Sequence, residues 1–511
     1  MLFGDSINTI IISVVSLLVA YYFYLREYKW KRFPPGPMGI PLLGYAPFLG
    51  DKASEKMMKI ADNYGPIFSL KMGDQTWVVL NTYDILHEAL VKHGEVFSGR
   101  PQVHIYKTFT KGLGIGFVDY GPFWKEQRKF GMNTLKRFGF GNVYMEDFIS
   151  EEVQYLIDEV ESYNGKSLNC HSLISNAVAN IVCRMTMSKR FPYGDKDFNE
   201  MLRLMNESFS AALDGKLYRI MVLAPFTRFL PVFWSCYNRL GKSRKVLLDA
   251  LQAVVDEHKQ TYDENNIRDF IDEFIKEMKT QNDENSNFTD EQLVHYVSDL
   301  FVAGTETTSS TLRWCMLCLA TYPEIQEKLF HEIQSVIGIK RAPSLKDKDL
   351  MPYTCAFIHE ITRHRIVLNI FVPHKTTASV MFKGFYIPKN TPIIAHPWSV
   401  HFDPQYFKNP REFLPERFIG EDGKFVPSPQ VIPFSLGPRY CLGKRLAKAE
   451  LFIFITGIVQ WFKILPDPEN PLPSFHEGVE GGVHAPHDFN VIFSRRKCFF
   501  LDVVSCRIPQ D

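Results

Sequence analysis

The segment around Cys441 has the residue types and spacing of a site built on a thiolate. Gly437, Pro438 and Gly443 interrupt regular structure on both sides of the cysteine, and a helix is predicted to follow at about 444–461. Cys441 is thereby predicted to lie in a tight loop at a helix N-terminus, where backbone N–H groups and the helix dipole stabilise a thiolate. The segment therefore predicts a nucleophilic or metal-binding cysteine.

Two kinds of chemistry are open to such a thiolate. A nucleophilic cysteine needs a histidine base, and no local signature of that kind is present. As a metal ligand Cys441 stands alone, because no second cysteine or histidine lies at the spacing of a zinc site. A single cysteine ligand in a glycine-bounded loop fits haem, where the porphyrin supplies the other four ligands. The segment therefore favours haem ligation.

A long helix is predicted from Thr289 to Thr321. Gln292 completes the pattern of a capping box with Thr289, and Pro323 bars continuation beyond Tyr322. The centre of this helix reads AGTETTSST and is rich in residues that weaken helices. Such a conflict is expected at functional sites, but hydroxyl groups that bond back to their own helix would explain it equally well. Both interpretations stay open at this point.

Five residues of the cysteine segment resemble the signature of a known family. Phe434, Gly437, Arg439, Cys441 and Gly443 match FxxGxRxCxG of the cytochrome P-450 superfamily without a mismatch. Further motifs occur in the family's order, namely WKEQR (124–128), AGTETT (303–308), EITR (360–363) and PERF (415–418). The resemblance extends from the N-terminal segment to about Arg496, and it is closest to the animal microsomal type.

The resemblance implies a fold, a cofactor and a partner. The implied fold is mainly α-helical with small β-sheets, and it binds haem b (iron protoporphyrin IX) through the Cys441 thiolate, whose electron donation favours O–O cleavage. Electrons are expected from NADPH through a partner flavoprotein reductase. Basic residues flank the haem motifs and form either a docking patch for the reductase or an ordinary solvated surface: Lys125, Lys129, Lys444, Arg445 and Lys448.

The other site residues are assigned from the resemblance. Glu306 and Thr307 match the family's acid–alcohol pair above the haem, which can relay protons. The haem propionates are expected to be bound by Arg100, Trp124, Arg128, His374 and Arg439. A buried triad is expected to support the cysteine side of the fold, so that losing one member damages folding rather than chemistry; its members are Glu360, Arg363 and Arg417.

The substrate pocket is expected between the long helix and the segment that follows EITR. Its predicted residues are Phe301, Ala303, Gly304, Asn369, Ile370 and Phe371. Ala303 and Gly304 are small and leave room for dioxygen. Asn369 stands where relatives usually have proline, so it removes a constraint on φ and adds a polar group. A steroid, terpenoid, fatty acid or foreign compound would suit a pocket in a chain with 42 Phe.

The N-terminal residues are predicted to anchor the chain in a membrane. Residues 6–25 contain no charge, and about twenty helical residues span the hydrocarbon core of a bilayer. Asp5 precedes this run and basic residues follow it from Arg26 to Arg32, which places the following domain in the cytosol. A cleaved signal peptide is the alternative, but neither a basic n-region nor a small-residue cleavage site is present. We therefore expect a retained single-pass anchor, and the resemblance to the microsomal type implies the endoplasmic reticulum membrane.

The chain is predicted to divide into four parts. These are a membrane anchor (1–25), a basic and proline-rich spacer (26–45), a haem-thiolate catalytic domain (46–496) and an atypical C-terminal tail (497–511). Helices are predicted at 55–64, 83–93, 151–163 and 242–262, strands at 67–72, 76–81 and 379–387, and further short hairpins around 392–395. An apolar run at 218–234 is expected either to form the pocket roof near the bilayer or to be a plain core helix.

Charge and cysteine content argue against two classes of protein. The 511 residues carry 58 Lys and Arg against 57 Asp and Glu, a balance that argues against a broadly basic nucleic-acid-binding surface. The nine cysteines are scattered and do not resemble a disulfide framework, so we expect the bulk of the chain in a reducing compartment.

The favoured function is that of a membrane-anchored monooxygenase. Such an enzyme inserts one atom of O₂ into a lipophilic small molecule and reduces the other to water. One alternative is a haem-thiolate isomerase or dehydratase that acts without a reductase, and the intact Glu306–Thr307 pair argues against it. Another is a non-catalytic haem- or lipid-binding protein, which NADPH consumption coupled to product would exclude.

Overall fold

The computed structural model describes most of the chain. The described residues are 13–14, 16–17, 32–40, 43–50, 52–73, 75–138, 143–214, 221, 225–281, 285–339 and 341–496. The predicted anchor at 1–25 lies outside them except at 13–14 and 16–17, and the predicted tail at 497–511 lies wholly outside them. Within the described part of the chain, no helix combines the length and the apolar character needed to cross a bilayer.

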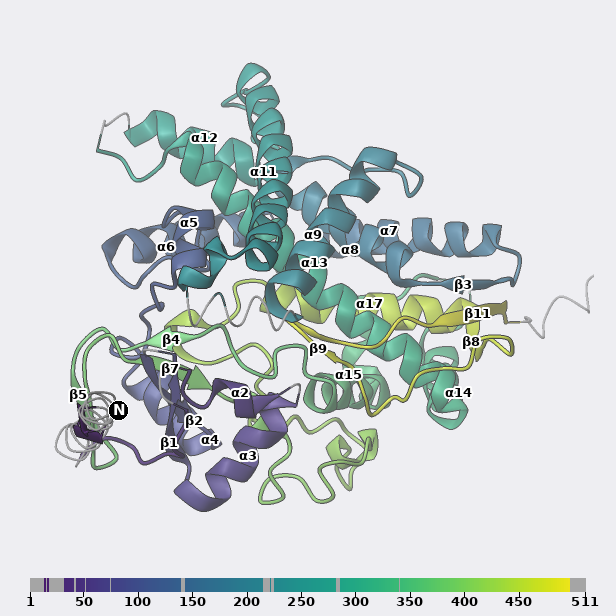
Figure 1. The fold of residues 1–511 in the computed structure, drawn as a ribbon. Helices are drawn as coiled ribbons and strands as arrows, with labels where there is room; N and C mark the ends of the chain where they lie inside the picture. Colours follow the sequence, from purple (N-terminus) through teal and green to yellow (C-terminus); the bar gives the residue numbers. More distant parts are fainter. Residues whose placement is uncertain are drawn as a thin grey trace, which may run out of the picture.

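Helices form most of the described structure, and the long ones gather in the upper and right-hand parts of Figure 1. The α-helices are α2 (Ala46–Leu49), α3 (Ala53–Tyr64), α4 (Tyr83–His87), α5 (His104–Thr110), α6 (Pro122–Arg137), α7 (Val143–Ser162), α8 (His171–Met187), α9 (Lys196–Asp214), α11 (Pro231–Gln260), α12 (Phe270–Gln281), α13 (Asp290–Thr321), α14 (Pro323–Val336), α15 (Pro352–His364), α16 (Pro397–His401) and α17 (Lys444–Trp461). Short 3₁₀-helices lie at Pro225–Phe229, Leu345–Leu350, Pro415–Phe418 and Gly437–Arg439, and a π-helical turn at Glu88–Lys92 extends α4.

The strands form small sheets, and the largest of them lies at lower left in Figure 1. Its order is β1 (Ile67–Met72), β2 (Gln75–Leu80), β7 (Pro392–Ala395) and β4 (His374–Lys375). The β2–β7 pair is parallel and the other two pairs are antiparallel. A second sheet has the order β3 (Ser167–Asn169), β11 (Asn490–Arg495) and β8 (Phe462–Pro466). Two hairpins complete the set: β5 (Val380–Phe382) with β6 (Phe385–Ile387), and β9 (Val479–Glu480) with β10 (His484–Ala485).

Most of the predicted elements are present, with longer or divided bounds. The helices predicted at 151–163 and 242–262 are the C-terminal parts of the longer α7 and α11. The single strand predicted at 379–387 is wrong, because the chain turns at Lys383 and Gly384, both with positive φ, and pairs back on itself as β5 and β6. The apolar run at 218–234 lies partly outside the described residues.

Helix α13 is the long helix predicted from its capping signals. The Thr289 side chain accepts a hydrogen bond from the backbone N–H of Gln292, and the 32-residue helix ends just before Pro323. Several of its hydroxyl groups bond back to its own backbone, as Thr307 does to the Ala303 carbonyl at 2.9 Å, whereas the Ser310 hydroxyl bonds the Glu306 carboxylate. These bonds satisfy polar groups that would otherwise be costly to bury, so a sequence with weak helix propensity persists in the core.

Helix α13 runs through the core, where α8, α11 and α17 contact it. Gly304 marks a close approach to α8, because a Cβ atom at this position would lie 2.8 Å from the Val182 Cγ2 atom. The fully buried Trp314 further along α13 donates its indole N–H to the His484 carbonyl at 3.0 Å. Contacts on several sides therefore fix the position of α13 in the core, including its middle part.

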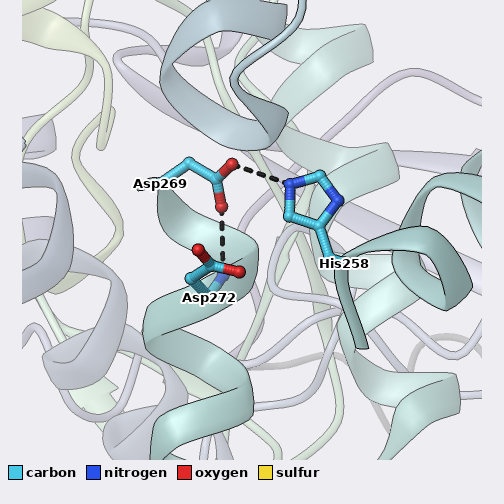
Figure 2. A group of neighbouring side chains, drawn as sticks. All are labelled: His258, Asp269 and Asp272. Atoms are coloured by element: carbon cyan, nitrogen blue, oxygen red, sulfur yellow. Dashed lines mark hydrogen bonds and ion pairs between the residues drawn. The ribbon is translucent and has the colours of Figure 1, made fainter. Parts of the chain in front are cut away.

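A buried ion pair joins the end of α11 to the start of α12 (Figure 2). The two ring nitrogens of His258 lie 2.8 Å from the Val254 carbonyl and 2.8 Å from the Asp269 carboxylate. Both partners are acceptors, so both nitrogens donate and the imidazole carries a charge. Asp269 also caps α12 by accepting the Asp272 N–H, and Asp272 is held by Arg268. Because each of these groups already has a protein partner, we interpret the cluster as a structural ion pair rather than a metal site.

We expect the substitution His258→Gln to reduce stability more at about pH 6 than at about pH 9. Burial and the positive charge of Arg268 lower the pKa of His258. The hydrogen bond to Asp269 and the negative charge of Asp269 outweigh these two effects, so the pKa is raised above 6.5. The stabilisation is therefore complete below the unfolded-state pKa and is lost as the pH rises through the folded-state pKa. Urea unfolding should show a loss of roughly 3 kcal/mol at the lower pH.

A control for this prediction lies one residue further along α11. Lys259 pairs with Asp290 at the surface, where both side chains are partly exposed. Lys259→Ala should change the free energy of unfolding by less than about 1 kcal/mol at either pH. An equal loss for His258→Gln at both pH values would show that the histidine is neutral in the fold.

Candidate active site

An internal cavity of about 730 Å³ is lined both by the middle of α13 and by the loop that holds Cys441. Further walls come from α11, from residues 109–117 before α6, from the segment 367–374 and from the β9–β10 turn. The lining is mostly apolar, with a small number of polar and cationic side chains. Its size falls within the range of about 300–1,000 Å³ that is usual for small-molecule sites.

Cys441 opens into this cavity from a constrained turn. Its backbone N–H donates to the Phe434 carbonyl at 2.8 Å, and α17 begins three residues later at Lys444. The turn requires glycine at 437, where φ is +69° and a Cβ atom would lie 1.7 Å from the Leu90 carbonyl oxygen. Local geometry and packing against the π-helical turn therefore present the sulfur to the cavity.

The sequence predicted that this position would stabilise the Cys441 thiolate, but its net effect on the pKa of the thiol is in the opposite direction. Burial raises the pKa of Cys441, although the backbone N–H of Gly443, the Arg128 guanidinium and Lys444 all act in the opposite direction. The helix N-terminus thus favours the thiolate as predicted, but desolvation is the larger effect. A bound cation is needed to hold this sulfur in its ionised form.

Several cationic groups gather on the wall next to Cys441. Arg439 donates to the Ser98 and Val118 carbonyls at 2.9 and 2.7 Å, and its guanidinium lies over the Trp124 ring. Burial and the neighbouring Arg100 and Arg128 lower the pKa of Arg439 to about 8. The hydrogen bonds that the structure shows for Arg439 all go to neutral oxygens, so its charge calls for an anionic partner.

The other predicted propionate ligands divide into two groups. Arg100, Trp124 and His374 line the cavity, but Trp124 donates its indole N–H to the Ile115 carbonyl and one His374 nitrogen bonds the Phe97 carbonyl. Arg128 is not among the described residues that line the cavity. Its guanidinium donates to the Tyr440 carbonyl at 2.5 Å, so it holds the residue next to Cys441 in place.

Only some of the predicted site residues of α13 face the cavity. Ala303, Gly304 and Thr307 line the cavity opposite the cysteine loop. Glu306 is absent from the described lining and is buried on another side of α13, where it accepts a hydrogen bond from Ser310 at 3.3 Å. Burial raises the pKa of Glu306 to about 7. Phe301 is fully buried and packs against Phe198.

The segment after α15 shows the same division. Ile370 and Phe371 line the cavity, together with Leu368. Asn369, between them, is not among the described lining residues, and its side-chain oxygen is buried without a hydrogen-bond partner. The predictions of Phe301 and Asn369 as pocket residues therefore disagree with the structure, because both side chains are buried outside the described lining, while the residues on either side of each line the cavity.

The family model for cytochrome P450 matches residues 34–493. The chain belongs to the cytochrome P450 family. Among its relatives, cytochrome P450 2U1 from Bos taurus is 39% identical over 478 residues, which cover 93% of this chain and 86% of that protein. Cytochrome P450 2C5 from Oryctolagus cuniculus is 37% identical over 490 residues, which cover 96% and 99%. The family resemblance drawn from the motifs is thereby confirmed.

Membership of the family settles the cofactor and the general reaction. Cytochrome P450 enzymes are haem-dependent monooxygenases that use haem b and electrons from NADPH delivered through a flavoprotein. The cavity of this cytochrome P450 fits that cofactor, because an open thiol lies beside the buried cations Arg439 and Arg100. The thiol suits an iron ligand, and the cations suit the two propionates.

The predicted triad is assembled beneath this site. Arg363 and Glu360 are fully buried and make two hydrogen bonds of 2.7 and 2.8 Å, and Arg417 reaches the same carboxylate at 3.1 Å. Arg363 also donates to the carbonyls of His401 and Pro410. The triad therefore ties α15 to the PERF motif and to the segment that precedes it.

Several polar residues of the cavity wall were not predicted from the sequence, among them Glu450 and Arg244. Glu450 on α17 is buried with its pKa raised to about 8 by burial, and it is hydrogen-bonded to Thr308 of α13. A lone acid within the apolar run AELFIFI was a usable signal for this group. Arg244 of α11 also lines the cavity, but it belongs to the charged sequence KSRK and gave no such signal.

Proposed function

We propose that this cytochrome P450 oxidises lipophilic small molecules at the cytosolic face of the endoplasmic reticulum membrane, with electrons from an NADPH-dependent flavoprotein reductase. The observation that supports this most directly is a largely apolar cavity shared by Cys441 and Thr307. The bound haem supplies iron that activates O₂ for insertion of one oxygen atom. Apolar walls hold a lipophilic substrate and exclude water around it.

The residues of the cavity are proposed to act on the cofactor and on protons. Cys441 would be the thiolate ligand, and Arg100, Arg439 and His374 would hold the propionates. Trp124 would line their site beside Arg439, and Arg128 holds the cysteine loop. Thr307 carries a hydroxyl on the cavity wall that can hold and pass on a proton at Oγ1. Glu306 precedes Thr307 in α13 and lies outside the described lining, and its pKa of about 7 suits a group that exchanges protons near neutral pH.

The reductase is proposed to bind the surface beside the cysteine loop. All five predicted basic residues are exposed, and they lie on α6 and at the start of α17. The hydrogen bond from Arg128 to the Tyr440 carbonyl brings these two elements together. Residues 1–25 are proposed as the single-pass anchor. The described part of the chain then faces the cytosol, where NADPH and the reductase are present.

The substitution Thr307→Ala tests this function through its coupling of NADPH use to product. In a reconstituted system with reductase, we expect NADPH consumption to continue while product per NADPH falls roughly 10- to 100-fold, since a positioned proton donor is lost. The measurement compares product, NADPH and peroxide for a panel of lipophilic compounds. Thr307→Ser should retain most of the coupling.

Thr311→Ala is the matched control for this experiment. Thr311 lies one turn further on, lines the same cavity and makes the same kind of bond, to the Thr307 carbonyl at 2.8 Å. Equal losses in the two alanine variants would reduce the Thr307 hydroxyl to a packing role. Conversion of a peroxide without reductase would instead favour the isomerase alternative, and haem binding with no turnover would favour a sensor.

A further inference from the structure

Helix α11 places one charged side chain on the wall of the cavity. Arg244 lines it together with Leu240 and Leu247 of the same helix. Its Nη1 donates to the Ser298 hydroxyl at 2.6 Å, and its Nη2 lies 3.3 Å from the His295 Nδ1. Its Nε is buried and has no hydrogen-bond partner. A cation is therefore built into this part of the lining, where Ser243 of α11 and Asp299 of α13 also line the cavity.

The hydrogen-bond partners of Arg244, Ser298 and His295, carry no negative charge. Burial and the charge of Arg244 itself lower the pKa of His295 to about 4, so this histidine is neutral at physiological pH. Asp299 is the acid that interacts with Arg244 through charge, but it accepts the backbone N–H groups of Ile115 and Gly116 at 2.8 and 3.0 Å. In the described part of the chain, no carboxylate reaches Arg244 within 4.0 Å. A buried guanidinium with neutral contacts is costly unless an anion joins it.

The other arginines of the described lining have different partners. Arg100 and Arg439 lie beside the cysteine loop, where the propionates are proposed to bind. Arg365 lies over the rings of Trp314 and Phe475, at 5.0 and 4.9 Å from their centroids. Arg244 is thus the arginine of the described wall that is left for a substrate.

We propose that Arg244 binds the carboxylate of an amphipathic substrate whose apolar chain lies along the cavity. This inference rests on the proposed function, because it assumes that the cavity is the substrate site. A guanidinium matches the geometry of a carboxylate, and a lipid carboxylic acid is ionised at neutral pH. An alcohol or ester of the same chain length has the same apolar contacts but no charge. The cavity should therefore discriminate acids from their neutral analogues.

The test is equilibrium binding of a matched set of ligands to the haem-loaded full-length protein. Isothermal titration calorimetry would compare dodecanoic acid, methyl dodecanoate and 1-dodecanol. We expect the wild type to bind the acid at least about tenfold more tightly than the ester or the alcohol. Arg244→Gln should weaken acid binding by about 10- to 100-fold and leave the alcohol within about twofold, and Arg244→Lys should fall between these.

A control separates the site from general surface charge. Lys111 is exposed and paired with Glu291 near the same end of α13, and Lys111→Gln should leave all three affinities unchanged. Equal weakening of acid and alcohol in Arg244→Gln would show that Arg244 only supports the helix packing. Acid binding no tighter than ester binding in the wild type would also overturn the proposal, and that comparison needs no variant to fold.

The outcomes also separate this proposal from the proposed function. Calorimetry requires no turnover, so acid-selective binding without product would retain the carboxylate site and reject the monooxygenase reaction on these ligands. Turnover of neutral compounds with no preference for acids would support the monooxygenase reaction and reject the carboxylate site.

Discussion

Cys441→Ala is expected to abolish the strongly red-shifted Soret band that the reduced protein gives with carbon monoxide. The shift depends on electron donation from a thiolate to the haem iron, and alanine has no ligand atom to supply it. The structure presents the Cys441 sulfur to the cavity, and no other cysteine is among the described residues that line it. We therefore expect product formation to fall below detection in the same variant.

The spectrum and a second cysteine variant make this prediction specific. Cys355 of α15 is partly buried, lies outside the described lining of the cavity and has its sulfur 3.5 Å from the Lys348 carbonyl. Cys355→Ala should keep the red-shifted band and the activity. A red-shifted band that survives in Cys441→Ala would contradict the assignment of the ligand. Wild-type protein that folds and binds haem without the shift would contradict thiolate ligation altogether.

Local signals predicted the elements that hold the site. The capping pair Thr289 and Gln292 and the barrier at Pro323 defined α13, and the glycines around Cys441 defined the turn and the start of α17. These signals are local because they depend on backbone hydrogen bonding within a few residues. The triad and the cysteine loop are likewise encoded in short motifs, so their residues could be named before their contacts were known.

The direction of each side chain could not be predicted in the same way. Helix α13 is buried on almost all sides, so its apolar residues have no period that marks one face. Phe301 was therefore assigned to the pocket, whereas Leu300, Val302 and Ala303 line it. The prediction for Asn369 is wrong for a related reason. The segment around it has no regular structure, so the direction of each side chain depends on contacts with residues far away in the sequence.

Arg244 could not be recognised as a cavity residue from the sequence, for a different reason. It lies between Ser243 and Lys245 in a run that resembles a solvated helix face, and Lys245 is indeed exposed. Only the packing of α11 on α13 turns Arg244 toward Ser298 and His295. A charged residue in a charged run becomes a candidate site residue only when the tertiary contacts are known.

Arg363→Ala is expected to cost most of the stability of the fold. The variant leaves the Glu360 carboxylate fully buried without its two strongest bonds, and the carbonyls of His401 and Pro410 lose their donor. Removing one partner of a buried ion pair costs about 3–5 kcal/mol, against a total stability of about 5–15 kcal/mol for a typical protein. Urea unfolding of the haem-loaded protein, with the yield of folded protein, measures the loss.

Two comparisons decide whether the loss comes from the buried charge. Lys328 and Glu416 form an ion pair on the same side of the fold, but 55% and 39% of their side chains are exposed, so Lys328→Ala should cost less than about 1 kcal/mol. Glu360→Gln combined with Arg363→Met removes both charges of this pair and should recover part of the stability lost in Arg363→Ala. The buried Glu360 side chain is then neutral, and Arg417 keeps its bonds to the carbonyls of Lys408, Asn409 and Glu412. If Arg363→Ala instead folds with normal stability and an intact red-shifted band but lacks activity, the triad acts on the chemistry, and its burial beneath the cysteine loop would need a different explanation.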